Sequence, residues 1–192
     1  MSTRENLFLV GPMGAGKSTV GRRLAQAVGM GFYDCDREIE QRTGASIPLI
    51  FELEGEAGFR RREKDMLERL TALQGVVLAT GGGAVLDPES RSRLSQRGRV
   101  IYLHTSVKQQ LARTSRDQNR PLLDTPDPEA RLRALIAERD PLYREIADLV
   151  VDTNGCSVSQ VVNELLQRLG LDRAQGTRKK HPGGGRANGG KR

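Results

Sequence analysis

The chain has 192 residues, of which 36% are hydrophobic and 29% are charged. This length suits one domain with a substantial core, and no apolar stretch approaches the ~18 residues that a membrane-spanning helix needs. The net charge of +7 comes from seven basic residues at 173–192, whereas residues 1–172 contain 24 acidic and 24 basic residues. The charge of the main body therefore does not indicate a nucleic-acid-binding domain.

The N-terminal segment and the cysteines indicate the cellular compartment, and the C-terminal composition indicates where the domain ends. The N-terminal segment MSTRENLFLV has too short an apolar run for a secretory signal, and it has no small-residue cleavage site. Cys35 and Cys156 are far apart and in no metal-ligand spacing, so we expect two idle thiols in the reduced cytoplasm. Residues 172–192 are rich in glycine, lysine and arginine, which predicts a disordered basic tail after a domain over residues 1–171.

Short apolar segments alternate with helical periodicity along the predicted domain. Strands are expected at 6–10, 31–34, 75–80, 99–104 and 149–153, and helices at 19–29, 37–73, 87–97, 106–114, 129–148 and 157–169. Such alternation is typical of a parallel sheet that is covered on both faces. We therefore predict an α/β fold, a three-layer α-β-α sandwich around a five-stranded parallel sheet.

The segment GPMGAGKST at 11–19 fits the phosphate-loop pattern G-x-x-x-x-G-K-[S/T] between a predicted strand and a predicted helix. Backbone N–H groups and the helix dipole of such a loop bind phosphate, Lys17 reaches the β- and γ-phosphates, and Ser18 ligates Mg²⁺. The predicted nucleotide contacts are Gly14, Ala15, Gly16, Lys17, Ser18 and Thr19. The chain has no guanine-recognition motif and is too short for motor machinery, which favours a small-molecule kinase.

Carboxylates follow the second predicted strand in the segment YDCDREIE. Asp34 and Asp36 are two residues apart and would project to the same side of a strand. At the carboxyl end of a strand, that side is the ligand crevice of an open α/β sheet. One acid could lie near the metal while the other accepts a hydroxyl proton. The alternative is that Asp36 only caps a helix.

Two further segments are candidates for binding the molecule that accepts the phosphate. In GFRRRE, at most one or two of the three arginines can face the crevice, and Glu63 could orient Arg60 toward a planar carboxylate. Taken alone, this segment could equally be a solvated charged face. In VVLATGGGAV, three consecutive glycines at 81–83 end an apolar strand, although a simple turn needs only one.

Taken together, the motifs resemble those of one kinase family. GPMGAGKST, FYDCD, GFRRRE, ATGGGAV, RPLL and RDPLYREIA occur in the order and at about the spacing of shikimate kinase, over residues 5–168. The resemblance implies a P-loop fold of the nucleoside-monophosphate-kinase type. It also implies a Mg²⁺-dependent, monomeric enzyme of chorismate and aromatic amino-acid biosynthesis, which transfers the γ-phosphate of ATP to the 3-hydroxyl of shikimate.

The resemblance also assigns roles to acceptor-side residues. It makes Asp36 the candidate base that holds the acceptor hydroxyl, and it places Arg60 and Arg139 on the shikimate carboxylate. Gly82 would offer main chain to a shikimate hydroxyl, since bare backbone admits a flat polyhydroxylated ring. Asp34 would contact Mg²⁺ through water.

A polar, proline-bearing segment at about 113–127 resembles the family's lid, which closes over ATP and excludes water. Arg120 matches the lid arginine that neutralises charge on the moving phosphoryl group, so the resemblance makes it catalytic together with Asp36 and Lys17. Arg113 matches a residue that packs on adenine, and for Arg116 solvent exposure is the simpler expectation. Cys156 stands near a family adenine contact and is a poor substitute for it.

Two alternatives remain at this point. A gluconate or nucleoside-monophosphate kinase shares the phosphate loop but lacks the combined DCD, GFR and GGG pattern. A nucleotide-binding regulator could use the basic tail for weak, salt-sensitive attraction to nucleic acid. That tail has no aromatic residues for base stacking, so we expect no specific nucleic-acid partner and no membrane partner.

Overall fold

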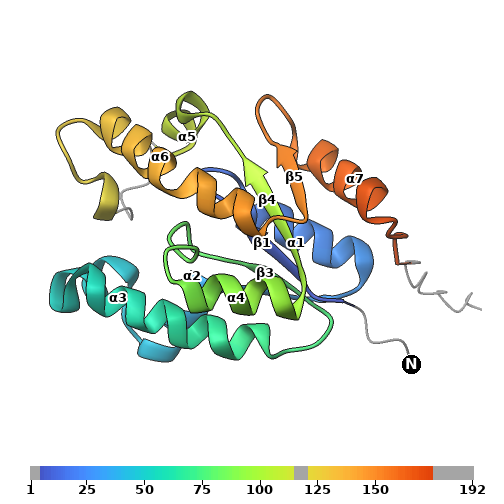
Figure 1. Ribbon diagram of the computed structural model, residues 1–192, viewed down its shortest axis with the longest axis horizontal. Helices are drawn as coiled ribbons and strands as arrows, with labels where there is room; N and C mark the ends of the chain where they lie inside the picture. Colours follow the sequence, from blue (N-terminus) through green and yellow to red (C-terminus); the bar gives the residue numbers. More distant parts are fainter. Residues whose placement is uncertain (1–4, 115–120, 175–192) are drawn as a thin grey trace, which may run out of the picture.

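The sheet of the protein is five-stranded and entirely parallel, as predicted (Figure 1). The computed structural model describes residues 5–114 and 121–174. The strands are β1 (Leu7–Val10), β2 (Gly31–Asp34), β3 (Val76–Ala79), β4 (Arg99–His104) and β5 (Leu149–Asp152), in the spatial order β2-β3-β1-β4-β5. The first strand lies in the middle of the sheet, so the loop that follows it emerges between two neighbouring strands.

Helices cover both faces of the sheet (Figure 1). One face carries α1 (Lys17–Val28) and α7 (Val158–Leu169); the other carries α2 (Cys35–Thr43), α3 (Ile47–Thr71), α4 (Pro88–Arg97) and α6 (Pro128–Ile146). Helix α5 (Val107–Thr114) and a short 3₁₀ helix, η1 (Pro121–Leu123), complete the described elements. The predicted three-layer sandwich is confirmed.

Alternation along the central strand produces the two halves of the core. Leu7 and Leu9 pack toward α1 and α7, whereas Phe8 and Val10 pack toward the helices of the opposite face. All four side chains are buried. Successive residues of a strand point to opposite faces, and an apolar residue on both faces identifies a strand that is covered on both sides.

The helical region expected at 37–73 is divided into two helices, and the second is kinked. Helix α2 ends at Gly44, whose φ of 68° is left-handed, and the Ser46 side chain caps α3 by accepting a hydrogen bond from the N–H of Leu49. Within α3, Gly55 has a φ of 68° and a ψ of −178°, which no helix accommodates. Glycine adopts such angles without steric cost. The breaks at Gly44 and Gly55 therefore let the α2–α3 segment change direction beside the carboxyl ends of the strands.

The end of the described chain returns to the body of the domain. The N–H of Ala174 donates to the carbonyl of Ala27 at 2.6 Å. Residues 175–192 lie outside the described residues, so the basic tail over 172–192 and its boundary with the domain stay predictions. Among the helices in the described ranges, none is long and apolar enough to cross a bilayer.

Candidate functional site

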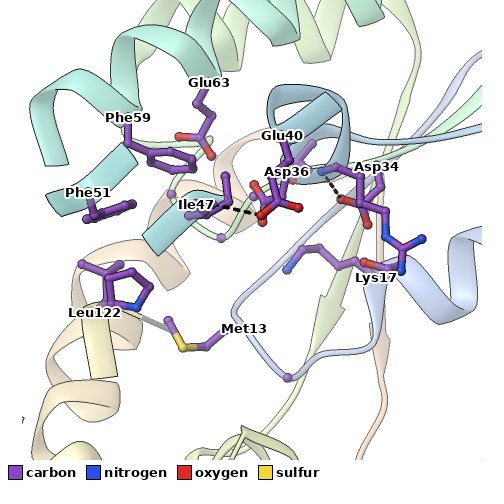
Figure 2. Close-up of a pocket in the computed structure, with 18 of the residues that line it drawn as sticks. Met13, Lys17, Asp34, Asp36, Glu40, Ile47, Phe51, Phe59, Glu63 and Leu122 are labelled. Carbon is purple, nitrogen blue, oxygen red and sulfur yellow. Dashed lines mark hydrogen bonds between the residues drawn. The ribbon is translucent and has the colours of Figure 1, made fainter. Parts of the chain in front are cut away.

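A cavity of about 630 Å³ opens where β1, β2 and β3 end. The phosphate loop forms one wall, and further walls are formed by the starts of α2 and α3, by Thr80 and by the glycine segment 81–83. Figure 2 shows Lys17, Asp34 and Asp36 on one side of this space and the apolar residues Phe51, Phe59 and Leu122 on the other. We call the part of the cavity beside the phosphate loop the nucleotide half. The partly apolar remainder, which Asp36 borders beside Gly81, is the acceptor half.

The phosphate loop has the geometry that its sequence predicts. Gly14 and Gly16 have φ values of 76° and 93°, and α1 begins directly after them at Lys17. The Lys17 side chain is buried and its Nζ donates to the carbonyls of Gly11 at 2.7 Å and Pro12 at 2.9 Å. A cation and a helix N-terminus thus lie at one point of the cavity, which suits a phosphate chain.

Most of the predicted nucleotide residues lie along this wall. Gly14, Gly16, Lys17, Ser18 and Thr19 line the cavity. The Ala15 side chain is buried in the core beneath the loop instead, so only its main chain could contact a ligand.

The geometric argument that paired Asp34 with Asp36 is wrong for Asp36. Strand β2 ends at Asp34, and Asp36 already belongs to the first turn of α2. The residue that caps this helix is Asp34, whose Oδ1 accepts from the N–H of Arg37 at 3.3 Å. Both aspartates nevertheless line the cavity, because the turn from strand to helix occurs at the carboxyl end of the sheet.

Arg60 is the arginine of the triplet that faces the cavity. Its Nη1 donates to Glu63 Oε2 at 2.6 Å, and its Nη2 donates to Glu56 Oε1 at 2.9 Å. Arg61 is exposed, and Arg62 pairs with Glu54 away from the cavity. The predicted orientation of Arg60 by Glu63 is confirmed, and the alternative of a solvated face holds only for its two neighbours.

Glu63 is a buried carboxylate at the base of the acceptor half. Burial raises the pKa of Glu63, and the nearby guanidinium of Arg60 opposes that shift. Its Oε1 is buried and accepts no hydrogen bond from the described residues. This carboxylate and its arginine form a fixed ion pair beneath the site, as expected where a buried charge must be compensated.

The three glycines of the motif have different neighbours. A β-carbon on Gly81 would lie 2.2 Å from Oε1 of Glu63 and 3.1 Å from Oδ1 of Asp36, and one on Gly83 would lie 2.1 Å from Nη1 of Arg60. Gly82 has more room, since the nearest atom to such a carbon is the backbone nitrogen of Met13 at 3.5 Å. A side chain at Gly81 or Gly83 would therefore displace the Glu63 carboxylate or the Arg60 guanidinium.

This arrangement corrects part of the explanation for the glycines. A ligand ring was expected to exclude all three β-carbons, whereas the protein's own Asp36, Glu63 and Arg60 already exclude two of them. The same distances bring a carboxylate and a guanidinium to the two ends of one glycine segment. Of the three glycines, only Gly82 is not fully buried, and only there would a β-carbon make ordinary van der Waals contacts.

Arg139 and Tyr143 extend the site from α6. Arg139 is buried and lines the cavity, and the Tyr143 hydroxyl, one helical turn later, donates a hydrogen bond to the carbonyl of Gly82. Burial raises the pKa of Tyr143 above its usual value, so the hydroxyl stays protonated. Tyr143 was not predicted as a site residue, although it lies in the motif RDPLYREIA.

An apolar wall was also missed. Met13, Ile47, Phe51, Phe59 and Leu122 surround the acceptor half of the cavity (Figure 2). The N–H of Ile47 donates to Oε1 of Glu40 at 2.9 Å, which fixes the start of α3 against α2. These residues come from three separate segments, the phosphate loop, α3 and η1, so no single local pattern could identify them together.

Arg113 joins the phosphate loop to the end of β5. Its Nη1 donates to the carbonyl of Gly14 at 2.9 Å and its Nη2 to the carbonyl of Thr153 at 3.1 Å. Cys156 follows in the same loop and is half-buried, whereas Cys35 is fully buried. Arg116, Arg120 and the rest of 115–120, within the predicted lid, lie outside the described residues.

Oxygen donors suitable for Mg²⁺ lie beside the phosphate loop. Ser18 and Asp34 both line the cavity next to Lys17, and Mg²⁺ prefers a few protein oxygens completed by water and substrate phosphates. Within residues 5–114 and 121–174, no group of three or more His, Cys, Asp and Glu side chains could hold a metal alone. The Ser18 hydroxyl and the Asp34 carboxylate fit an ion whose other ligands are water and nucleotide phosphates.

The comparisons with known proteins agree on one family. A family model for shikimate kinase matches residues 13–170. The shikimate kinase of Pseudomonas entomophila is 63% identical over 164 residues, which cover 85% of this chain and 95% of that protein. The structure of shikimate kinase from Acinetobacter baumannii in complex with shikimate is 53% identical with a TM-score of 0.85, covering 86% of this chain and 92% of that one.

A more distant structure separates fold from family. A gluconokinase from Sinorhizobium meliloti has a TM-score of 0.55 over 86% of this chain and 91% of that one, but it is only 19% identical, so it shows the fold alone. The family match covers the phosphate loop from residue 13 onward, the glycine segment and α6 alike. On these matches and the site that they span, the chain belongs to the shikimate kinase family.

Proposed function

We propose that this protein phosphorylates the 3-hydroxyl of shikimate with ATP, yielding 3-phosphoshikimate and ADP. One observation carries the proposal: the Asp36 carboxylate and the Arg60 guanidinium flank the glycine segment 81–83, inside the cavity that the phosphate loop opens into. An anionic, hydroxylated ring needs a cation for its carboxylate, an acceptor for its reacting hydroxyl and bare main chain beneath it. The acceptor half of the cavity offers all three.

Binding and orientation account for most of the proposed catalysis. Arg60, held by Glu63, and the buried Arg139 bind the shikimate carboxylate, and Gly82 contributes main chain to a ring hydroxyl. Asp36 accepts the proton of the 3-hydroxyl as that oxygen attacks the γ-phosphorus of ATP. Phosphoryl transfer needs little covalent chemistry from the protein, so positioning and charge neutralisation dominate.

The nucleotide half neutralises the phosphate chain. Lys17 lies at the N-terminus of α1, where it can contact the β- and γ-phosphates. Mg²⁺ would be held by Ser18 directly and by Asp34 through water, and it supplies charge neutralisation when it is bound with ATP. Arg113 would pack on adenine, and Arg120 in the lid would neutralise charge on the transferred group.

The experiment is a direct test of acceptors. The purified chain is incubated with Mg²⁺, ATP and, separately, shikimate, gluconate or AMP, and the products are identified by phosphorus NMR and mass spectrometry. Phosphate on the 3-oxygen of shikimate alone is the expected result. Efficient phosphorylation of gluconate or AMP, with none of shikimate, would overturn the proposal.

The basic tail allows a separate check on a regulatory role. Deleting residues 175–192 removes six of the seven excess positive charges but no residue of the described cavity. We expect kcat and both KM values to stay within about 2-fold, since charges remote from a site are screened. A large loss of activity would instead favour a role for the tail in the working enzyme.

A further inference from the structure

The glycine segment contains no side chains that could fix its own main chain. Each glycine has wide conformational freedom, yet a segment that binds a ligand through its peptide groups must present them in one orientation. The carbonyls of Gly81 and Gly83 are held locally, since they accept hydrogen bonds from the N–H groups of Ala84 at 3.3 Å and Leu86 at 3.0 Å. The carbonyl of Gly82 accepts its hydrogen bond from the hydroxyl of Tyr143.

Tyr143 is itself held firmly. Its side chain is fully buried, and its ring packs on Tyr102 of β4 with centroids 4.9 Å apart at an interplanar angle of 30°. The Tyr102 hydroxyl donates to Oδ1 of Asp140 at 2.7 Å. The hydroxyl of Tyr143 is therefore carried by a stack of two rings between β4 and α6, which leaves it little freedom to move.

Arg139 is the second acceptor-side residue on the same helix. Both side chains are buried, and the two residues lie one turn apart on α6, where side chains share a face. Helix α6 thus carries two groups that the proposed function relates to shikimate: the Arg139 guanidinium, and the Tyr143 hydroxyl that holds the main chain of Gly82.

We propose that Tyr143 is a positioning residue for shikimate, which holds the main chain of Gly82 through its hydroxyl and keeps it in register with Arg139. This inference rests on the proposed function, because it concerns the same acceptor. It adds that α6 contributes to shikimate binding at two points. One is the Arg139 side chain, and the other is the hydrogen bond from Tyr143 to Gly82. Tyr143 does not line the cavity itself, so we expect it to act on shikimate only through Gly82.

The test compares two buried tyrosines that stack on one another. Tyr143→Phe removes the hydroxyl that holds Gly82, and Tyr102→Phe removes the hydroxyl that binds Asp140. Both changes delete one oxygen from the same ring stack, so their general effects on packing are matched. Each full-length variant is characterised by steady-state kinetics, by calorimetry with shikimate and with an ATP analogue, and by thermal unfolding.

We expect Tyr143→Phe to raise the KM and Kd for shikimate by about 5-fold, the order of one lost hydrogen bond. The Kd for the ATP analogue should stay within about 2-fold of the wild-type value, because the phosphate loop does not depend on this tether. Tyr102→Phe should leave both ligands within about 2-fold while lowering Tm comparably. A purely structural role would instead lower Tm in both variants and weaken both ligands alike.

Three results would overturn the inference. In the first, wild-type protein phosphorylates shikimate and Tyr143→Phe has an unchanged KM for it, which leaves the proposed function intact. In the second, both tyrosine variants weaken shikimate equally. In the third, the wild-type chain neither binds nor phosphorylates shikimate, which overturns the proposed function as well.

A measurement on the wild-type chain covers the case in which Tyr143→Phe fails to fold. With carbon-13 at the glycine carbonyls, exchange of labile protons for deuterium should shift the Gly82 resonance more than the following amide alone would, both without and with shikimate. The Gly155 carbonyl, in the loop after β5, is the control that gives the shift due to the following amide. A Gly82 shift no larger than that of Gly155 in either state contradicts the tether.

Discussion

The two halves of the cavity are built in different ways. The phosphate site of the nucleotide half is one continuous segment, residues 11–19, which contributes its main chain and a single lysine. The acceptor half is assembled from four separate segments that contribute Asp36, Arg60, Gly82 and Arg139. A local motif specifies the first, whereas the second depends on tertiary structure, so a change on the acceptor side should leave nucleotide binding intact.

Among the changes that test whether the two halves are independent, we expect substitution of Asp36 to have the largest effect on activity. In Asp36→Asn the acceptor hydroxyl loses its proton acceptor, so we expect kcat to fall by about 10³-fold, within the usual range for a general base. Calorimetry should find the affinity for an ATP analogue within about 2-fold of wild type. Glu38→Gln is the matched control, because Glu38 lies in the same helical turn but does not line the cavity. A near-normal kcat in Asp36→Asn would remove Asp36 from the base role.

Arg60 is expected to give the next largest effect. A lysine cannot keep the Glu63 and Glu56 contacts and also bind a carboxylate with two parallel hydrogen bonds. Arg60→Lys should therefore raise the KM for shikimate by about 30-fold, the scale of lost charge-assisted hydrogen bonds. Arg62→Lys, whose parent side chain pairs with Glu54 outside the cavity, should change neither KM. An equal rise in the KM for ATP would show that the two halves are not independent.

Gly82 tests the acceptor surface without disturbing the fold. The space around Gly82 accepts a β-carbon, whose nearest neighbour would be 3.5 Å away, and its φ lies outside the left-handed region. We expect Gly82→Ala to keep its free energy of unfolding within about 1 kcal/mol while its affinity for shikimate falls by about 10-fold. Gly83→Ala is the comparison, since its β-carbon would displace the Arg60 guanidinium directly. Unchanged shikimate affinity in Gly82→Ala would mean that the ring does not lie on this glycine.

The smallest effect concerns the two thiols, one beside each half. Burial, together with the carboxylates of Glu63, Asp36 and Asp34, raises the pKa of Cys35 well above its usual value, so this thiol stays protonated at pH 8. Cys156 is only half-buried. Iodoacetamide at pH 8 should therefore modify Cys156 alone in the folded chain and both cysteines after unfolding, as peptide mass spectrometry would show. Rapid labelling of Cys35 in the native chain would show that the acceptor half opens readily.

The sequence predicted the parts of the molecule that local chemistry determines. Strand 99–104 matched β4, and Gly29 ended α1 as expected, because burial and left-handed glycine leave clear local patterns. The turn at Asp34 was misread: a strand and a helix that meet without a loop give no local boundary, so Asp36 was placed on the wrong element.

The features of the site that the sequence did not predict depend on contacts between distant segments. Nothing near Gly81 or Gly83 indicates that Glu63 and Arg60 cross them. The bond from Tyr143 to Gly82 joins positions 61 residues apart. The apolar wall drawn in Figure 2 likewise comes from separate segments.

The most direct test of the central claim is a crystal structure of the full chain with ADP and shikimate. The account predicts the shikimate carboxylate on Arg60 and Arg139, the 3-hydroxyl within about 3.2 Å of a carboxylate oxygen of Asp36, and the ring against Gly82. Shikimate bound outside this cavity, or bound with its 3-hydroxyl beyond hydrogen-bonding reach of Asp36, would contradict it.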